Sequence, residues 1–219
     1  MKTETALIVG AGSGLSASLA RLFAREGMSV ALAARNTTKL AALVKETAAV
    51  AIECDASVPA QVDAMFDRVG ETALVVYNAG YRTRGPLVSL DPKEVERTLA
   101  ISAYGGFLVG QAAAKRMLAR GSGSIFFTGA SASVKGYAGS APFAMGKFAL
   151  RGLAQSMARE LAPKGLHVAH FVIDGHIGEA PNDGMLLPDE IANSYLAVHR
   201  QHRSAWTWEV ELRPWAEKF

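Results

Sequence analysis

The sequence predicts an α/β fold: a doubly wound parallel sheet of about seven strands with helices on both faces. Short apolar runs alternate with amphipathic segments along most of the chain, as in strands joined by crossover helices. A glycine-rich turn, Gly10-Ala11-Gly12-Ser13-Gly14, directly follows the first apolar run. The sequence shows no repeat, low-complexity segment or linker, so we expect residues 1–219 to form a single domain.

The first unit of the sheet is expected at residues 5–35, in the order strand, turn, helix, strand. Residues 6–9 are wholly apolar, as in a buried parallel strand. Apolar residues at 15, 19, 22 and 23 then recur at helical spacing, and Gly27 ends that helix. A second apolar run covers residues 29–33. Strand, glycine turn, helix and strand in this order are typical of a unit that binds a dinucleotide.

The glycines of the turn are suited to a diphosphate. Gly10 allows a sharp turn out of the strand. Gly12 and Gly14 let the backbone come close to a diphosphate, whose charge is met by N–H groups at the start of the helix. The common fingerprint G-x-G-x-x-G fails because Leu15 stands where its last glycine belongs, and the wider G-x-x-x-G-x-G ends in Ser16. The alternative is a glycine turn without a ligand. The expected cofactor contacts are Gly10, Gly12, Ser13, Gly14 and Leu15.

The end of the second strand indicates which dinucleotide fits. NAD-binding units commonly place a carboxylate here for the ribose 2′-hydroxyl, whereas NADP-binding units place an arginine for the 2′-phosphate. Ala34 supplies no carboxylate and Arg35 supplies a guanidinium, which can grip a phosphate through paired hydrogen bonds. Lys39, in the helix expected next, can assist. The pattern favours NADP over NAD; the alternative is a solvated arginine.

The remaining elements follow from apolar runs and helix signals. Ser57 is expected to cap a helix that has Pro59 in its first turn, and Asp91 to cap a helix that begins with Pro92. Pro163 and Gly165 stop a long helix. We expect strands at 50–54, 73–77, 124–128, 166–173 and 206–212, and helices from the Ser57 cap to about 69 and at 92–118, 143–162 and 188–202.

Length and composition exclude several classes of protein. Half of the 219 residues are hydrophobic, which argues against disorder, and no apolar run approaches the roughly 18 residues of a membrane span. The chain enters its first strand without a signal peptide, so we expect a cytoplasmic protein. A net charge of +3 from scattered basic residues does not favour nucleic acid. The single cysteine, Cys54, excludes an internal disulfide and a cysteine-only metal site, and is interpreted as a buried, inert thiol; we expect no metal.

Polar and glycine residues stand where several of these strands end. Ligands of open parallel sheets bind outside the carboxyl ends of the strands. Gly10, Asp55, Asn78, Ser131 and Gly175 all fall at such ends. The sequence therefore predicts a Rossmann-type site at one edge of the sheet.

With these residues in place, the chain resembles the short-chain dehydrogenase/reductase family over nearly its whole length. The matching residues are the Gly10/Gly14 turn, Asp55, Asn78-Ala79-Gly80 and Lys147. The resemblance implies that Asp55 holds the adenine, that Asn78-Ala79-Gly80 brace the sheet beside the cofactor, and that Lys147 holds the nicotinamide ribose. It also assigns Ala56, Gly175 and Ile177 to the cofactor site.

The resemblance is weaker in the residues that do the chemistry. The family's Y-x-x-x-K reads Phe143-Ala144-Met145-Gly146-Lys147, as in an atypical branch that this chain resembles. The family's Asn position holds Ser102, its Ser position holds Ala130 with Ser131 one residue later, and its Pro-Gly reads Asp174-Gly175. In carbonyl reduction the family's tyrosine gives a proton to oxygen, and a positioned acid contributes about 10²- to 10⁴-fold. Phenylalanine has no proton to give.

Three side chains are candidates to replace the phenol. Tyr104 lies near Ser102, but helical geometry turns it to another face. Tyr137 lies in the loop before Phe143, and His176 follows the sixth strand; histidine readily exchanges protons near neutrality. Ordinary structural roles are the alternative for all three. The expected catalytic residues are Lys147, Ser131, Ser102 and His176.

Lys147 stands on the mostly apolar side of its helix, where an ammonium needs an acceptor. Ribose hydroxyls would supply one; the alternative is a lysine that reaches solvent. The leading hypothesis is an NADP-dependent oxidoreductase that acts on a small carbonyl compound or alcohol with an incomplete catalytic tetrad. The other hypothesis is a pseudoenzyme that binds NADP as a sensor or oligomer partner. The resemblance implies a homodimer or homotetramer, with Trp206, Trp208 and Trp215 at an interface or in the core.

Overall fold

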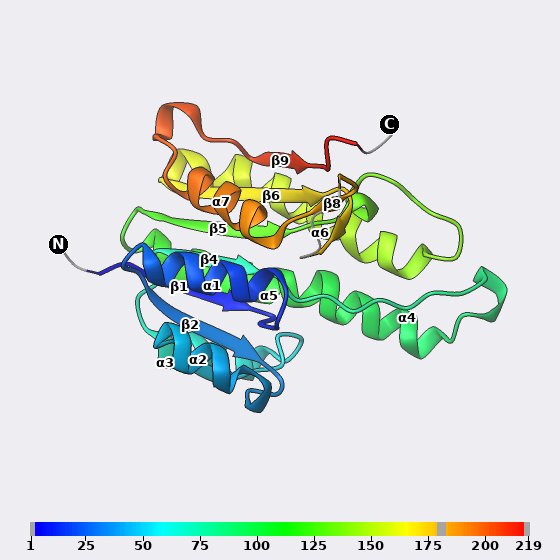
Figure 1. The fold of residues 1–219 in the computed structure, drawn as a ribbon, viewed down its shortest axis with the longest axis horizontal. Coiled ribbons are helices and arrows are strands. Elements are labelled where there is room, and N and C mark those ends of the chain that lie inside the picture. Colours follow the sequence, from blue (N-terminus) through cyan, green and yellow to red (C-terminus); the bar gives the residue numbers. More distant parts are fainter. Residues whose placement is uncertain (1–2, 179–182, 217–219) are drawn as a thin grey trace.

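The computed structural model describes residues 3–178 and 183–216. Its centre is a seven-stranded sheet in the order β3-β2-β1-β4-β5-β6-β9, with every neighbouring pair parallel. This confirms the doubly wound fold (Figure 1). The strands are β1 Thr5–Val9, β2 Ser29–Ala34, β3 Val50–Glu53, β4 Leu74–Tyr77, β5 Gly123–Thr128, β6 Leu166–Ile173 and β9 Glu209–Leu212.

The order of the strands reverses next to β1. β1 pairs with β2 on one side and with β4 on the other. The chain therefore adds β2 and β3 on one side of β1 and then β4, β5 and β6 on the other. A crevice opens at such a switch point, outside the carboxyl ends of the strands. The glycine turn that follows β1 therefore lies beside the crevice.

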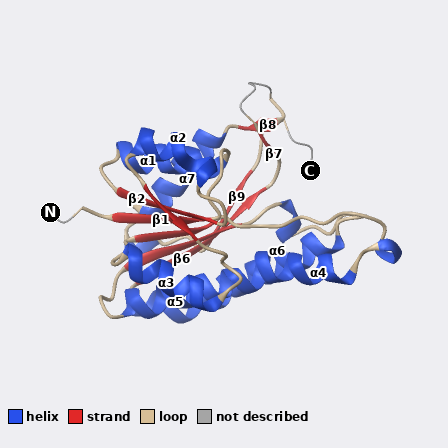
Figure 2. Cartoon of the chain, turned by 90° about the horizontal axis from the view of Figure 1, so that it is seen from below, coloured by secondary structure: helices blue, strands red, loops and turns tan. Residues whose placement is uncertain are grey.

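Helices cover both faces of the sheet, as Figure 2 shows. One layer holds α1 Leu15–Arg25, α2 Ala41–Thr47 and α7 Pro188–His199. The other holds α3 Pro59–Val69, α4 Pro92–Leu99, α5 Gly105–Leu118 and α6 Ala141–Leu161. Along β1, Ala6 and Ile8 belong to the first layer's core and Leu7 and Val9 to the second, which explains why the strand is apolar at every position.

The predicted helix over 92–118 is one rod with a change of winding in its middle. α4 begins after Asp91, whose carboxylate accepts the Lys93 N–H at 2.9 Å, so the expected cap is confirmed. A π-helical turn, Ala100–Tyr104, joins α4 to α5. The buried Tyr77 hydroxyl, from β4, donates to the Ile101 carbonyl inside this turn. α4 and the loop before it project beyond the carboxyl ends of the strands (Figure 1).

Several expected boundaries are wrong by a few residues, each for a local reason. Val58, not Ser57, precedes α3, because Ser57 instead donates to the Asp55 carboxylate. Lys39 lies in a 3₁₀ turn, Thr38–Leu40, ahead of α2. The last helix ends at His199 instead of residue 202. The last strand begins at Glu209 instead of 206, because the chain between them forms a 3₁₀ turn, Arg203–Ala205, and Trp206 stacks on His167 with ring centroids 4.8 Å apart.

A two-stranded ladder lies outside the main sheet and was not expected. It pairs β7 His176–Ile177 with β8 Met185–Leu186 in parallel, beyond the carboxyl end of β6. None of the helices in the described part of the chain is long and apolar enough to cross a bilayer.

Candidate active site and cofactor cleft

A cleft of about 300 Å³ follows the carboxyl ends of β1 to β4, at the switch point of the sheet. The structure brings together there seven of the residues expected at a cofactor: Gly10, Arg35, Asp55, Ala56, Asn78, Ala79 and Gly80. Gly12, Ser13, Gly14 and Leu15 do not line this cleft, because they lie where the turn enters α1. Leu15 is 4% exposed, so only its backbone can face a ligand.

The glycine turn has two separate reasons for its glycines. Gly10 has a φ of +86°, and a Cβ on it would come within 2.4 Å of the Ala79 backbone, so packing alone requires glycine there. A Cβ on Gly12 or Gly14 would meet no atom within 4 Å. α1 starts without a side-chain cap and without an acid in its first turn. Open space beside uncapped N–H groups fits a diphosphate.

Ser16, in the place of a glycine in the wider fingerprint, ties the turn to the neighbouring strand. Its hydroxyl donates to the Gly10 carbonyl at 3.2 Å and accepts from the Asn78 side chain at 2.7 Å. The Asn78 N–H also donates to the Val9 carbonyl at 2.8 Å. Asn78 therefore braces the ends of β1 and β4.

The far end of the cleft carries one exposed cation and one carboxylate. Arg35 follows β2 and is exposed along the cleft. Asp55 accepts from the Ser57 N–H at 2.9 Å and from the Ser57 hydroxyl at 2.6 Å. Although burial opposes it, these bonds and the charge of Arg35 hold the pKa of Asp55 below its usual value. Cys54, next to Asp55 in the chain, is buried as expected, and burial raises the pKa of its thiol to about 11; that the thiol is inert stays a prediction.

A second cavity, of about 620 Å³, lies beyond the ends of β5 and β6. Its lining includes Ser131, His176, Gly175 and Ile177, four of the residues predicted for the site. It shares no lining residue with the cofactor cleft. Lys147 and Ser102, the other two catalytic candidates, line neither cavity.

Lys147 is buried between the two cavities. Its ammonium donates to the Thr128 carbonyl at 2.7 Å and lies 5.7 Å from the centre of the Phe143 ring. A Cβ on Gly80, which lines the cofactor cleft, would come 3.8 Å from the same nitrogen. The side chain is 5% exposed, so the alternative of a lysine that reaches solvent is wrong. Burial lowers the pKa of Lys147 to about 8.

Phe143 turns its ring toward the second cavity, where a tyrosine would present its hydroxyl. Tyr137 and His176 line the same cavity and are exposed. Tyr104 stacks on Phe107, with ring centroids 6.3 Å apart, on an exposed face of the α5 rod, as the helical argument predicted. Of the three candidates for a proton donor, two therefore lie near Phe143.

Ser102 holds the loop after β4 in place. Its side chain is fully buried; the hydroxyl accepts the Tyr81 N–H at 3.3 Å and donates to the Tyr81 carbonyl at 3.4 Å. A Cβ on Gly146 would clash with Ser102 at 2.8 Å, so α6 packs directly against it. Ser102 is thus placed to position a loop and not to touch a substrate.

Asp174, in the place of the family's proline, forms the floor of the second cavity. Its carboxylate lies 2.8 Å from the Lys135 ammonium and 4.0 Å from Arg213. Burial opposes it, but hydrogen bonds from Lys135 and Ser131 hold the pKa of Asp174 below its usual value. The carboxylate is therefore ionised and already paired.

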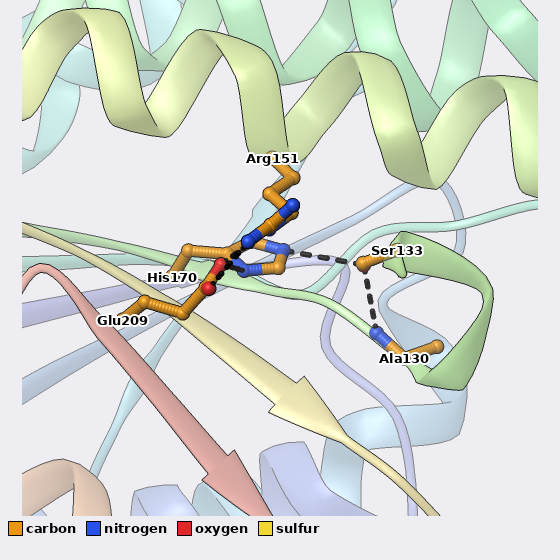
Figure 3. A network of polar contacts seen from close by, with 5 residues as sticks. All are labelled: Ala130, Ser133, Arg151, His170 and Glu209. Carbon is orange, nitrogen blue, oxygen red and sulfur yellow. Dashed lines mark hydrogen bonds and ion pairs between the residues drawn. The ribbon is translucent and has the colours of Figure 1, made fainter. Parts of the chain in front are cut away.

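The structure also contains a polar network that the sequence did not reveal (Figure 3). The Ser133 hydroxyl accepts the Ala130 N–H at 3.1 Å and lies 3.2 Å from His170 Nε2, while His170 Nδ1 lies 3.2 Å from Glu209. Arg151 donates twice to Glu209, at 2.6 and 2.7 Å. The network joins α6, β6 and β9 to the turn that carries Ser131, because Ser133 ends that turn. His170 is fully buried, and burial lowers its pKa to about 4.

Among the described residues, no three His, Cys, Asp or Glu side chains gather as metal ligands would.

Sequence reasoning also missed Arg82 and Arg84, which line the second cavity. Their signal was present: two arginines, two residues apart, follow Asn78-Ala79-Gly80 at a strand end where ligands bind.

Comparison with known proteins agrees with this geometry. The family model for short chain dehydrogenases matches residues 4–175, so the chain belongs to the short-chain dehydrogenase family. A D-threitol dehydrogenase of Mycolicibacterium smegmatis is 30% identical over 215 residues, covering 86% of this chain and 83% of the relative.

Two solved structures are similar over nearly the whole chain. A short-chain dehydrogenase from Rhodopseudomonas palustris is 36% identical with a TM-score of 0.88, covering 98% of this chain and 100% of that one. A metagenomic short-chain oxidoreductase in complex with NADP is 27% identical with a TM-score of 0.85, covering 96% and 97%.

Proposed function

We propose that this protein is an NADP-dependent oxidoreductase that interconverts a small carbonyl compound and the corresponding alcohol. One observation carries the proposal: the start of the glycine turn at Gly10, Arg35 and Asp55 line one cleft at the switch point, and Lys147 is buried between this cleft and a separate cavity. The NADP complex of the metagenomic relative supports the choice of cofactor. NADP held in this cleft would supply or accept the hydride.

The chain's own residues divide the remaining tasks. The open turn at Gly12 and Gly14 would hold the diphosphate, and Arg35 would pair with the 2′-phosphate, because a planar guanidinium matches a phosphate through paired hydrogen bonds. Among the described residues, the Lys147 ammonium donates to one carbonyl, that of Thr128, so further N–H donors would be available to ribose hydroxyls. In the second cavity, His176 is the proposed proton donor, with Ser131 as a hydrogen-bond partner for the substrate oxygen.

Thermal melting with each cofactor tests the proposal. NADPH at 100 times its dissociation constant stabilises by about 2.7 kcal/mol, which is a rise of roughly 5–10 °C at this length. Arg35→Asp replaces a charge-assisted contact by repulsion, so we expect NADPH to bind at least 10-fold more weakly while NADH binds as well or better. Melting that responds to neither cofactor would contradict the proposal.

A second function is favoured by one residue. Phe143 cannot give a proton, so an NADP-binding pseudoenzyme, acting as a sensor or oligomer partner, is the other candidate. A substrate screen with the parent protein and Phe143→Tyr separates the two. Turnover in the parent supports the enzyme, and turnover in the variant alone supports the pseudoenzyme. On any substrate found, His176→Ala and Tyr137→Phe identify the donor: the one that leaves turnover unchanged has no acid role.

We also propose a cytoplasmic homodimer or homotetramer. Exposed apolar side chains lie on two helices of one layer: Tyr104, in the π-helical turn, stacks on Phe107 of α5, and Met145 and Phe148 belong to α6. Burying them against a second copy would remove apolar surface from water. Light scattering after size exclusion measures the mass; Phe148→Glu should halve it, and a monomeric parent would contradict the proposal.

A further inference from the structure

Two arginines face the second cavity from the loop after β4. Arg82 and Arg84 both line it, as do His176 and Gly175, which follow β6. The Arg82 guanidinium lies 4.9 Å from the centre of the Phe143 ring, so it is held over the residue that replaces the family's tyrosine. One positive charge therefore lies beside Phe143, and a second lines the same cavity.

Neither arginine has a carboxylate partner among the described residues. Glu94, the nearby acid of α4, accepts from the Tyr81 hydroxyl at 2.5 Å and pairs with Arg97 at 3.6 Å. Asp174, the one carboxylate among the described residues that line the cavity, is paired with Lys135 and Arg213. The positive charge of the arginine pair is thus not neutralised from within the described chain.

The loop that carries the two arginines is fixed at both ends. Ser102 holds Tyr81 through two hydrogen bonds to its backbone. The Gly85 N–H donates to the Gly139 carbonyl at 2.9 Å, across to the loop that precedes α6. A loop tied down immediately before Arg82 and immediately after Arg84 presents both guanidinium groups without a large loss of backbone freedom on binding.

Holding these two cations together is unfavourable in the free protein. Partial burial and the charge of Arg84 both lower the pKa of Arg82, which is the response of a cation to lost solvent and to a like charge. An anion between them would relieve the repulsion. The proposed cofactor contacts for the phosphates, Gly12, Gly14 and Arg35, do not line this cavity, so a different group would have to supply the anion.

We propose that the substrate carries an oxyanion group, a carboxylate or a phosphate, which Arg82 and Arg84 bind while its carbonyl or alcohol lies beside Phe143. The planar guanidinium fork matches both groups through paired hydrogen bonds. This inference rests on the proposed function, because it takes the cavity to be the substrate site.

Binding of inert acids and their neutral counterparts tests the inference. The probes are glutarate beside glutaramide, cyclohexanecarboxylate beside cyclohexanecarboxamide, and methyl phosphate beside trimethyl phosphate. Each is titrated by calorimetry into NADPH-saturated protein and into cofactor-free protein. We expect at least one acid to bind 10-fold or more tightly than its neutral counterpart, and added salt to weaken it. The acid whose affinity most exceeds that of its neutral counterpart shows whether the site prefers a carboxylate or a phosphate.

Variants connect the binding to the arginines. Arg82→Gln and Arg84→Gln should each weaken the acid 10-fold or more and leave the neutral probe and NADPH unchanged. Arg68→Gln, an exposed position on α3 that lines neither cavity, makes the same change of net charge and should have no effect. Circular dichroism checks that each variant folds; the acid-against-neutral comparison in the parent needs no variant.

The outcomes separate this inference from the proposed function. Neutral probes that bind as tightly as acids, acids that fail to bind at 10 mM, or acid binding unchanged in both arginine variants would each overturn the oxyanion inference. If NADPH still raises the melting temperature in these cases, the oxidoreductase proposal stands. If acids bind through the arginines but NADPH does not bind, the oxidoreductase proposal fails and the oxyanion site stands.

Discussion

His170→Asn should remove a pH dependence of stability that a buried imidazole builds into this fold. His170 is fully buried, and its folded pKa of about 4 lies below the ordinary value of 6.5. Burial is the main cause, and the positive charges of Lys147 and Arg151 act in the same direction, whereas Glu209 opposes them. Asparagine keeps hydrogen-bonding groups at this position but does not titrate.

The sign and size of the effect follow from proton linkage. Between pH 6.5 and pH 4 the unfolded chain protonates this histidine while the folded protein does not, so stability falls as the pH falls. Between pH 7 and pH 5 the loss is about 2 kcal/mol, or roughly 4–8 °C in Tm for a chain of this length. Arg151, 2.6 Å from Glu209, holds the pKa of that carboxyl below its usual range, so Glu209 stays charged in this window.

Urea denaturation of parent and variant at pH 5, 6 and 7 measures the effect. Burial also lowers the pKa of His167 and of His199, so both proteins lose stability on acidification. The difference between parent and variant in how steeply the free energy of unfolding changes with pH gives the contribution of His170. This difference does not depend on the variant's stability at pH 7. His202→Asn, at an exposed histidine, should keep the parent's slope. Equal slopes for parent and His170→Asn would refute the reasoning.

Three further predictions follow from single contacts. Gly10→Ala should lower stability by about 3 kcal/mol in thermal melts, because a Cβ at φ +86° meets Ala79, whereas Gly12→Ala should change it by less than about 1 kcal/mol; equal losses would contradict this. Lys147→Met should raise the cofactor-free protein's free energy of unfolding at pH 7 by about 1–2 kcal/mol and weaken NADPH binding. The reason is that burying the ammonium costs more free energy than its hydrogen bond to the Thr128 carbonyl contributes. A lower melting temperature in the variant would contradict this. The Cys54 thiol should react with a disulfide reagent only on unfolding, and rapid labelling of the native protein would disprove its burial.

Much of the fold could be predicted because strands that are buried on both faces of a sheet consist of runs of apolar residues. The bounds of β6, Leu166–Ile173, match the prediction to the residue, because a mostly apolar run lies between Gly165 and Asp174. The cofactor cleft could be predicted for a related reason: its residues follow strand ends, and parallel strands bring their carboxyl ends to one edge. Predicted element boundaries were wrong where a side chain contacts a residue far away in the sequence, as Trp206 contacts His167.

The rest of the site depends on contacts between distant segments. His170 lies within an apolar run and its partners are Ser133 and Glu209, 37 and 39 residues away. No spacing rule connects residues so far apart. Arg82 and Arg84 face the cavity because a hydrogen bond from Gly85 to Gly139 closes their loop over it, and this too lies beyond local pattern.

The π-helical turn at Ala100–Tyr104 makes the rod of α4 and α5 intolerant of a change in length. Each residue of an α-helix advances the rotation by about 100°, so losing one residue here would turn α5 relative to α4 by that angle. Gly105 and Gly106, which let Tyr77 approach, would face elsewhere, and the Tyr77 hydroxyl would lose its acceptor at Ile101. Substitutions along the rod can be tried one at a time, but a deletion would uncouple the sheet from the loop that carries the arginines. Natural relatives should therefore vary the composition of this rod and conserve its length.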